Sequence, residues 1–179
     1  IQNPLQAQLA SAIGERSCLH EFELFLCSTG AEAIENALKL SSFHTGRKKV
    51  IAFHGAFHGR TSAAVAVTDN PNINAPLNSQ HEVTFLPFND VEALEKELAT
   101  KAYCAVIFEA IQGVGGLDQP NEEFVLAMES LCKKYDSCLI ADEVQSGFGR
   151  SGTFFAYQKY PITPHIITMA KGMGNGFPI

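Results

Sequence analysis

The sequence lacks several features that would assign it to particular classes of protein. Its longest basic run is Arg47-Lys48-Lys49 and its net charge is −6, so we expect no nucleic-acid or acidic-membrane partner. No apolar stretch is as long as a membrane span. No signal peptide is visible, but the chain begins at Ile1 without a Met, which leaves open an upstream segment. The five cysteines include no C-x-x-C pair, and most lie in apolar runs, which is typical of reduced, buried thiols and predicts a cytoplasmic protein.

Short apolar runs alternate with stretches of helical periodicity along the chain. The run at 104–108 is wholly apolar, which predicts a strand buried on both faces. Repeated strand-helix units of this kind predict an α/β three-layer sandwich with a mostly parallel sheet. We expect strands at 22–27, 50–53, 83–86, 104–108, 138–141 and 165–168, and helices that begin at Asn3-Pro4, Thr29, Arg60, Asn89 and Asn121.

Both ends of the chain are interpreted as cuts. The sequence starts within a predicted helix and stops at Phe177-Pro178-Ile179, just after a glycine-rich turn. We therefore expect residues 1–179 to form one domain of a longer protein.

Parallel sheets bind ligands beyond the carboxyl ends of their strands. Three predicted strand ends carry unusual residues: Thr29-Gly30-Ala31, Asp142-Glu143 and Lys171. Lys171 follows an apolar run and precedes glycines, and we expect burial to make it a usable amine nucleophile. Taken alone, it also fits a lysine whose amine reaches solvent.

Asp142 ends the apolar run 138–141, and a carboxylate buried there needs a partner. A protonated pyridine nitrogen would serve, and so would a salt bridge or a helix N-cap role. The Thr29-Gly30-Ala31 segment opens a helix and fits an anion site, although a plain cap would look the same. Phe57, at a glycine-framed turn, could stack on a flat ring or pack in the core.

Two other patterns resemble known ligand sites but lack residues that those sites need. His54 and His58 are four residues apart, but glycines interrupt the segment and it lacks the glutamate of H-E-x-x-H, so we expect no metal site. The segment 147–152 fits G-x-G-x-x-G, but no Asp or Glu follows Glu143, so a dinucleotide site is not expected.

Several motifs occur in an order that resembles the class III aminotransferases, which are pyridoxal 5'-phosphate (PLP) enzymes of fold type I. The resemblance covers nearly the whole chain from about Phe22 onward. Ala110 and Ser151 depart from it, since many members have Pro and Thr there. The motifs are Thr29-Gly30-Ala31-Glu32-Ala33, Ala56-Phe57-His58-Gly59-Arg60-Thr61, Glu109 with Gln112-Gly113-Val114-Gly115-Gly116, Asp142-Glu143-Val144-Gln145-Ser146-Gly147-Phe148-Gly149-Arg150-Ser151-Gly152 and Ala170-Lys171-Gly172.

The resemblance implies a role for each motif. Lys171 would be the catalytic Schiff-base lysine. Glu109 would line the substrate side, where such enzymes use a glutamate to control a substrate-binding arginine. The chain would be the PLP-binding large domain, without the N-terminal segment and the C-terminal small domain of a homodimeric enzyme. The implied cofactor-binding residues are Thr29, Gly30 and Ala31 at the phosphate, Phe57 and Val144 on the ring faces, Asp142 at the ring nitrogen, Gln145 near the 3-oxygen, and His58 and Lys171.

Within the family, the stretches 52–60 and 88–90 look most like the members that use N-acetylornithine and 2-oxoglutarate in bacterial arginine synthesis. Other class III reactions stay open: transamination of ornithine, succinylornithine or 4-aminobutyrate, and the glutamate semialdehyde aminomutase reaction. A catalytically inert PLP-domain fragment is the remaining alternative.

Overall fold

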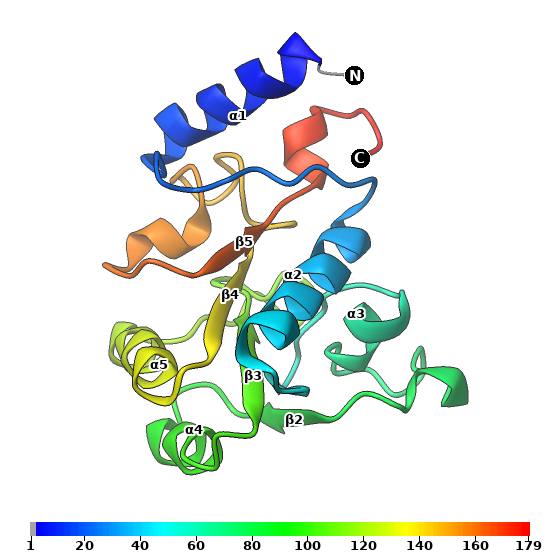
Figure 1. The fold of residues 1–179 in the computed structure, drawn as a ribbon, viewed down its shortest axis with the longest axis vertical. Coiled ribbons are helices and arrows are strands. Elements are labelled where there is room, and N and C mark those ends of the chain that lie inside the picture. Colours follow the sequence, from blue (N-terminus) through cyan, green and yellow to red (C-terminus); the bar gives the residue numbers. More distant parts are fainter. Residues whose placement is uncertain (1–2) are drawn as a thin grey trace.

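Five parallel strands form one sheet in the order β2-β1-β3-β4-β5 in the computed structural model, which describes residues 3–179 (Figure 1). Each strand pairs in parallel with its neighbours. The longer elements are α1 (Pro4–Ser17), α2 (Gly30–Thr45), β1 (Lys49–Phe53), α3 (Ser62–Ala66), β2 (Val83–Leu86), α4 (Val91–Leu98), β3 (Tyr103–Phe108), α5 (Glu122–Tyr135), β4 (Cys138–Asp142) and β5 (Ile166–Thr168). Short 3₁₀ turns occur at Pro76–Asn78, Ala156–Lys159 and Lys171–Gly174.

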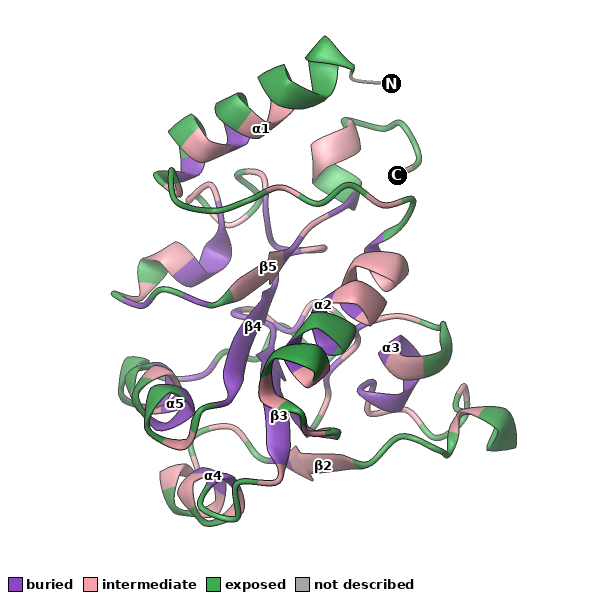
Figure 2. Cartoon of the chain, in the orientation of Figure 1, coloured by how far each residue is buried: buried purple, intermediate pink, exposed green. Residues whose placement is uncertain are grey.

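Helices cover both faces of the sheet, so the predicted three-layer α/β arrangement is confirmed. One apolar cluster packs α4, α5 and the end of α1 against alternate residues of β1, β3 and β4. The other cluster packs α2 and α3 against the opposite face of the same strands. Every residue of β3 and β4 is buried, and Figure 2 shows them as the interior layer. None of the helices in the described part of the chain has the length and apolar character needed to cross a membrane.

Side-chain caps start α1, α2, α4 and α5 near the predicted positions, whereas α3 begins without one. Thr29 caps α2 by accepting a hydrogen bond from the Glu32 amide, and Asn121 caps α5 in the same way. The predicted cap of α4 at Asn89 is wrong: the adjacent Asp90 accepts the Ala93 amide instead. Asn89 adopts a positive φ of 68° and its side chain accepts the amide of Asn121, so it joins the two helix starts.

The predicted strand at 22–27 is not part of the sheet. This segment is extended and runs from α1 to α2 beside β5, but it joins no ladder (Figure 1). The strand was predicted from its short run of mostly apolar residues. Pairing, however, needs a neighbouring strand within hydrogen-bond reach, and sequence periodicity does not report one.

Arg47, between α2 and β1, binds the start of β3 and the end of α5, and we expect its loss to destabilise the fold. Its guanidinium donates to the carbonyl oxygens of Tyr103, Tyr135 and Asp136 at 3.2, 2.8 and 2.7 Å. The substitution Arg47→Met keeps most of the bulk but leaves these carbonyls without their donor, which should lower the unfolding free energy by about 2 kcal/mol. Urea denaturation measures the change, with the exposed Arg150→Met as the matched control. Equal stability of the two variants would contradict this role.

Candidate active site

The carboxyl ends of β1, β3, β4 and β5 lie at the same edge of the sheet because the strands are parallel and adjacent (Figure 1). The loop with Phe57 and His58 follows β1, and Glu109 follows β3. Asp142 is the last residue of β4, and Lys171 comes shortly after β5. The fold therefore collects at one edge residues that are up to 114 positions apart in the sequence, from Phe57 to Lys171 (171 − 57 = 114).

Asp142 lies at the centre of this edge with only 4% of its surface exposed. Its Oδ2 atom is 2.7 Å from Nδ1 of His58, whose side chain is fully buried. Its Oδ1 atom accepts from the amide of Val144 at 3.0 Å and from the hydroxyl of Thr168 at 3.2 Å. Groups of the protein itself, from the β1 loop, the segment after β4 and β5, therefore supply part of the partner that this buried carboxylate needs.

The loop at 54–61 is held by side chains from outside it. Its amide groups donate to carboxylates and a hydroxyl, which fixes the backbone that carries Phe57 and His58. The threonine at its end and the first turn of α3 are bound by a carboxylate of α2. The contacts are Gly55 to Asp69 at 2.9 Å, Phe57 to Glu109 at 2.9 Å, His58 to Thr68 at 2.9 Å, and Thr61 and Ala63 to Glu35 at 2.7 Å each.

Phe57 and Glu109 are joined within this arrangement. Phe57 is half-buried and belongs to neither apolar cluster, so plain core packing does not describe it. Glu109 is 3% exposed and accepts the amides of Phe57 at 2.9 Å and Gly113 at 3.3 Å. Burial raises the pKa of Glu109, and the negative charge of Asp142 adds to the rise, whereas His58 and the two amides oppose it.

The amino end of α2 lies against two other segments of the site. A Cβ atom placed on Gly30 would be 2.8 Å from Cγ1 of Val144 and 3.2 Å from Cβ of Ala170. Only a residue without a side chain allows this close approach. Thr29, Val144 and the residue before Lys171 are therefore brought together, although they come from three parts of the sequence.

Gln145 packs over the loop that follows β3. A Cβ atom on Gly113 would lie 2.3 Å from Cδ of Gln145, so glycine is needed there as well. The amide of Gly113 also contacts Glu109, which places Gln145 beside the Glu109 loop. This contact was not visible in the sequence, because it depends on how two adjacent strand ends meet.

Lys171 differs from expectation in one respect. The residue is exposed, so the prediction of a buried amine is wrong for this chain. It opens a 3₁₀ turn with a φ of 42°, which is uncommon for a residue with a side chain. Ala170, just before it, is buried, and Thr168 contacts Asp142. The chain just before Lys171 is therefore fixed at the Asp142 end of the sheet, and the exposed Lys171 side chain makes no hydrogen bond or ion pair with the other described residues.

The two histidines of the β1 loop contact different carboxylates. His54 is exposed and lies 3.3 Å from Asp69, whereas His58 is buried against Asp142. The G-x-G-x-x-G segment at 147–152 forms turns after β4 and opens no helix directly. It therefore lacks the helix amino end that a dinucleotide site uses to bind pyrophosphate.

Two further buried polar residues lie at this edge, and the sequence analysis assigned neither of them a role of its own. Thr168 donates to Asp142, and its place at the end of an apolar run was the available signal. The Glu143 carboxylate accepts the hydroxyl of Ser146 and the amides of Ala156 and Tyr157 at 2.7–2.9 Å. Glu143 thereby ties the turn after β4 to the sheet edge, while burial raises its pKa.

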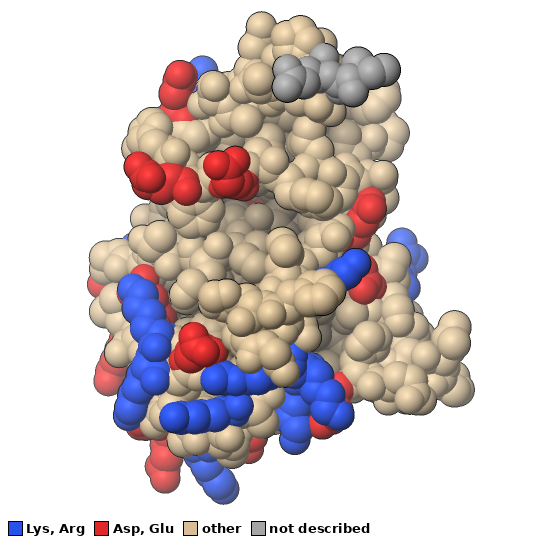
Figure 3. Space-filling model, viewed as in Figure 1, with Lys and Arg blue, Asp and Glu red and all other residues tan. Residues whose placement is uncertain are grey.

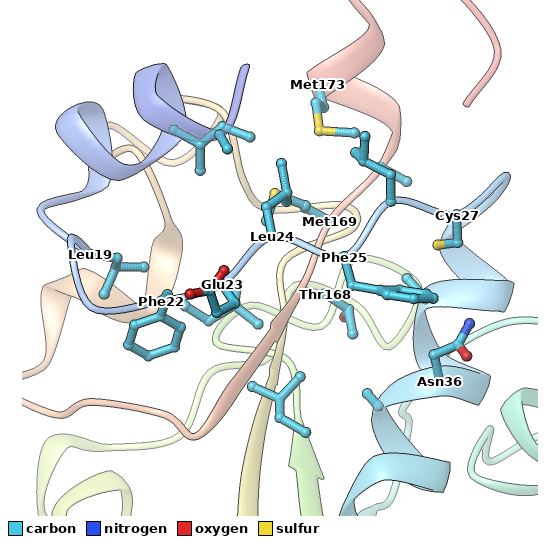
Figure 4. A pocket seen from close by; sticks show the side chains of 18 of the residues that line it. Leu19, Phe22, Glu23, Leu24, Phe25, Cys27, Asn36, Thr168, Met169 and Met173 are labelled. Carbon is cyan, nitrogen blue, oxygen red and sulfur yellow. The ribbon is translucent and has the colours of Figure 1, made fainter. Parts of the chain in front are cut away.

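A cavity of about 430 Å³ lies between the extended segment 19–27, α2 and β5. Figure 4 shows Leu24, Phe25 and Met169 among its mostly apolar walls. Thr29 and Thr168 border it, but Asp142, Phe57 and Glu109 do not. We therefore place the candidate site at the strand ends and not in this cavity.

The charged side chains visible on one face of the molecule are unevenly distributed. In Figure 3, Lys and Arg gather over the lower part of the molecule, around α4, α5 and the amino ends of the strands. The carboxyl ends of β3, β4 and β5 point toward the upper part of the molecule (Figure 1). The basic side chains visible on this face thus gather away from these strand ends.

The sequence matches the class III aminotransferase family over residues 2–179. It is 46% identical over 175 residues to an acetylornithine aminotransferase of Archaeoglobus fulgidus, covering 97% of this chain and 46% of that protein. It is 40% identical over 178 residues to one of Halalkalibacterium halodurans, covering 98% and 45%. The chain thus spans a little under half the length of the curated relatives that it matches.

Solved structures show the same fold. An S-selective transaminase from Arthrobacter sp. superposes with a TM-score of 0.86 at 28% identity, over 99% of this chain and 46% of that one. A taurine:2-oxoglutarate aminotransferase from Bifidobacterium kashiwanohense, solved with PLP and glutamate, superposes with a TM-score of 0.87 at 25% identity, over 99% and 45%.

Gly30→Ala tests the close approach at the amino end of α2. The added methyl would collide with Val144 and Ala170, so we expect a loss of about 1–3 kcal/mol in unfolding free energy. Gly14→Ala in α1 is the control, because its Cβ would meet nothing nearer than 3.7 Å and should stabilise that helix by about 0.5–1 kcal/mol. Thermal unfolding of both variants gives the comparison, and an unchanged Gly30→Ala chain would refute the close contact.

The raised pKa of Glu109 predicts a pH-dependent stability. The unfolded carboxyl titrates near pH 4.3, and the folded one at a higher pH. The stability contributed by the protonated form is fully present below the unfolded pKa and is lost as pH rises through the folded pKa. Glu109→Gln cannot titrate, so its unfolding free energy should rise relative to wild type across that window.

Urea denaturation at a series of pH values measures this difference, which is worth about 1.4 kcal/mol for each unit by which the pKa is raised. Glu123→Gln, on the exposed side of α5, is the matched control. A difference between Glu109→Gln and wild type that stays constant with pH would contradict the assignment.

Proposed function

Because the chain belongs to the class III aminotransferase family, we propose that its strand ends form the PLP site of an enzyme that transfers an amino group from N-acetylornithine to 2-oxoglutarate. The substrate is supported by the relatives at 40–46% identity, which are acetylornithine aminotransferases. The observation that carries the proposal is the buried Asp142 carboxylate, at the same sheet edge as the amino end of α2 and Lys171.

Asp142 fits the ring nitrogen of PLP. A carboxylate offers about four acceptor positions, and the protein fills three of them, from His58, Val144 and Thr168. The remaining position and the negative charge suit a protonated pyridine nitrogen. When bound, PLP supplies an aldehyde and a ring that draws electrons from a substrate carbon, and a carboxylate at its nitrogen supports that role.

The amino end of α2 fits the phosphate. The amides of Gly30 and Ala31 have no acceptor among the described residues, and the hydroxyl of Thr29 lies beside them. Free amides and the positive end of a helix dipole stabilise a dianion. Glu32 does not compete with a phosphate, because its carboxylate accepts the amide of Ser28 at 2.6 Å.

The remaining residues would surround the ring and the substrate. Phe57 and Val144 would pack on opposite ring faces, and Gln145 would lie near the 3-oxygen. Lys171 would supply the amine to which PLP attaches, and its Nζ atom would then carry a proton between the substrate carbon and the cofactor carbon. Its exposed side chain is suited to movement between these two tasks.

Glu109 would face the substrate. Its carboxylate accepts hydrogen bonds from the Phe57 and Gly113 amides, so a change in the hydrogen-bond partners of Glu109 would also change the position of Phe57.

We assign the chain to the large domain of a cytoplasmic homodimer. Residues from outside this chain would complete substrate binding, so the chain alone should be a poor catalyst.

Covalent trapping tests the proposal on this chain. We expect PLP followed by borohydride to leave a pyridoxyl group on the peptide that contains Lys171, detected by mass spectrometry after digestion. Lys171→Ala should abolish this modification, because the amine that we propose as the attachment point comes three residues after Thr168, the register partner of Asp142 in the sheet. Lys39→Ala, in the exposed part of α2, is the matched control and should be labelled like wild type. Equal labelling of wild type and Lys171→Ala would contradict the proposal.

A further inference from the structure

Glu143 directly precedes Val144 of the candidate site, but the proposed function gives it no task. Its side chain is buried, with 1% of the residue exposed. The carboxylate accepts the hydroxyl of Ser146 at 2.7 Å and the amides of Ala156 at 2.9 Å and Tyr157 at 2.8 Å. All three partners are neutral groups. Burying a carboxylate without a cation is unfavourable, so a need for bulk alone does not account for Glu143.

We propose that Glu143 is a positioning residue that fixes the turn after β4 and thereby holds Val144 and Gln145 where they meet the cofactor. The inference deepens the proposed function and rests on it for the identity of the ligand. Glu143 itself would touch neither cofactor nor substrate, because both of its carboxylate oxygens are bound by groups of the protein.

The turn after β4 is closed at its base by Glu143. The carbonyl oxygen of Glu143 accepts the amide of Gly147 at 3.0 Å, and its carboxylate accepts the hydroxyl of Ser146. A Cβ atom on Gly147 would lie 2.8 Å from that carbonyl oxygen, so glycine allows the turn to close this tightly. The amide of Glu143 donates to the carbonyl oxygen of Thr168 at 2.9 Å. The base of the turn is therefore joined to β5 and to its own far end.

Val144 and Gln145 form the tip of this closed turn. Both are partly exposed, whereas the residues of the base, 143 and 146–147, are buried. Val144 lies against Gly30 at the amino end of α2, and Gln145 lies against Gly113 in the loop after β3. We refer to these two pairs as the tip contacts. The turn thus directs two side chains to two walls of the candidate site, and its own position depends on the base that Glu143 holds.

The 3₁₀ turn at Ala156–Lys159 gives Glu143 a second task. Phe155, at the start of this turn, has no side-chain acceptor, and the Glu143 carboxylate binds the first two amides instead. Gln158 stabilises the same 3₁₀ turn, since its Oε1 atom accepts the Phe155 amide at 2.9 Å and its Nε2 atom donates to the carbonyl oxygen of Ser17 at 2.8 Å. Loss of Gln158 therefore weakens the 3₁₀ turn without removing a contact of the turn after β4.

Three variants separate positioning from general stability. Glu143→Gln keeps the size of the side chain but places an N–H donor where the protein presents donors. Ser146→Ala removes only the link from the carboxylate to the turn after β4, and it should act in the same direction but more weakly. Gln158→Ala is the matched control, because it destabilises the 3₁₀ turn and leaves Glu143 in place.

NMR of the cofactor-free chain tests the placement without any ligand. We expect nuclear Overhauser effects for both tip contacts in wild type and in Gln158→Ala. They should disappear in Glu143→Gln and weaken in Ser146→Ala. Their absence from wild type, or their retention in Glu143→Gln, would overturn the inference whether or not PLP binds. If Glu143→Gln does not fold, unchanged tip contacts in Ser146→Ala would overturn it.

Binding of PLP and of inorganic phosphate tests the consequence, with phosphate followed by the amide shifts of Gly30 and Ala31. Phosphate needs only the amino end of α2, whereas PLP also needs the side chains at the tip of the turn. We expect Glu143→Gln to weaken PLP by about tenfold and phosphate by less than about twofold. Gln158→Ala should change the affinity for PLP by less than about twofold.

Equal weakening of PLP and phosphate in Glu143→Gln, or an equal loss of PLP affinity in Gln158→Ala, would show a merely structural role and overturn the inference. Failure of wild type to bind PLP would instead refute the proposed function, and the tip contacts would still decide whether Glu143 fixes the turn.

Discussion

The arrangement depends on one buried carboxylate that the fold surrounds with donors. Asp142 lies 2.7 Å from a ring nitrogen of a histidine of the β1 loop, and it accepts hydrogen bonds from an amide after β4 and a hydroxyl of β5. Burying a carboxylate is unfavourable unless its charge is compensated, so these elements must meet in one geometry for the site to exist. The parallel order of β1, β3, β4 and β5 achieves this, because it places their carboxyl ends together.

The surrounding loops are stabilised by the same kind of interaction. Glu109, Asp69 and Glu35 accept amides of the β1 loop or of the helix that follows it, and Glu143 accepts amides of the turn after β4. Carboxylates bound to backbone amides fix loops without a large apolar core beneath them. The site is thus supported from several strands, which is what a ligand-binding edge of a sheet requires.

Much of the fold could be predicted from the sequence because the strands are short, apolar and separated by well-capped helices. The buried runs at 104–108 and 138–141 lie at the centre of the sheet, as their composition predicts. The segment 22–27 could not be placed, since its pairing depends on a neighbour that periodicity does not reveal.

Asp142 and the amino end of α2 were identified as candidate site residues from residue type and position. The contacts of Asp142 with His58 and Thr168 were not, because they join residues 84 and 26 positions away. The exposure of Lys171 was also missed, since an apolar run before a lysine does not show whether its side chain leaves the interior.

The most direct measurement is a crystal structure of the chain after PLP has been reduced onto it with borohydride. The account predicts a pyridoxyl group on Lys171, with its ring nitrogen about 2.7–3.0 Å from the Asp142 carboxylate and its phosphate at the amides of Gly30 and Ala31. A pyridoxyl group on Lys171 whose ring points into solvent, with Asp142 bound only to the protein, would contradict it.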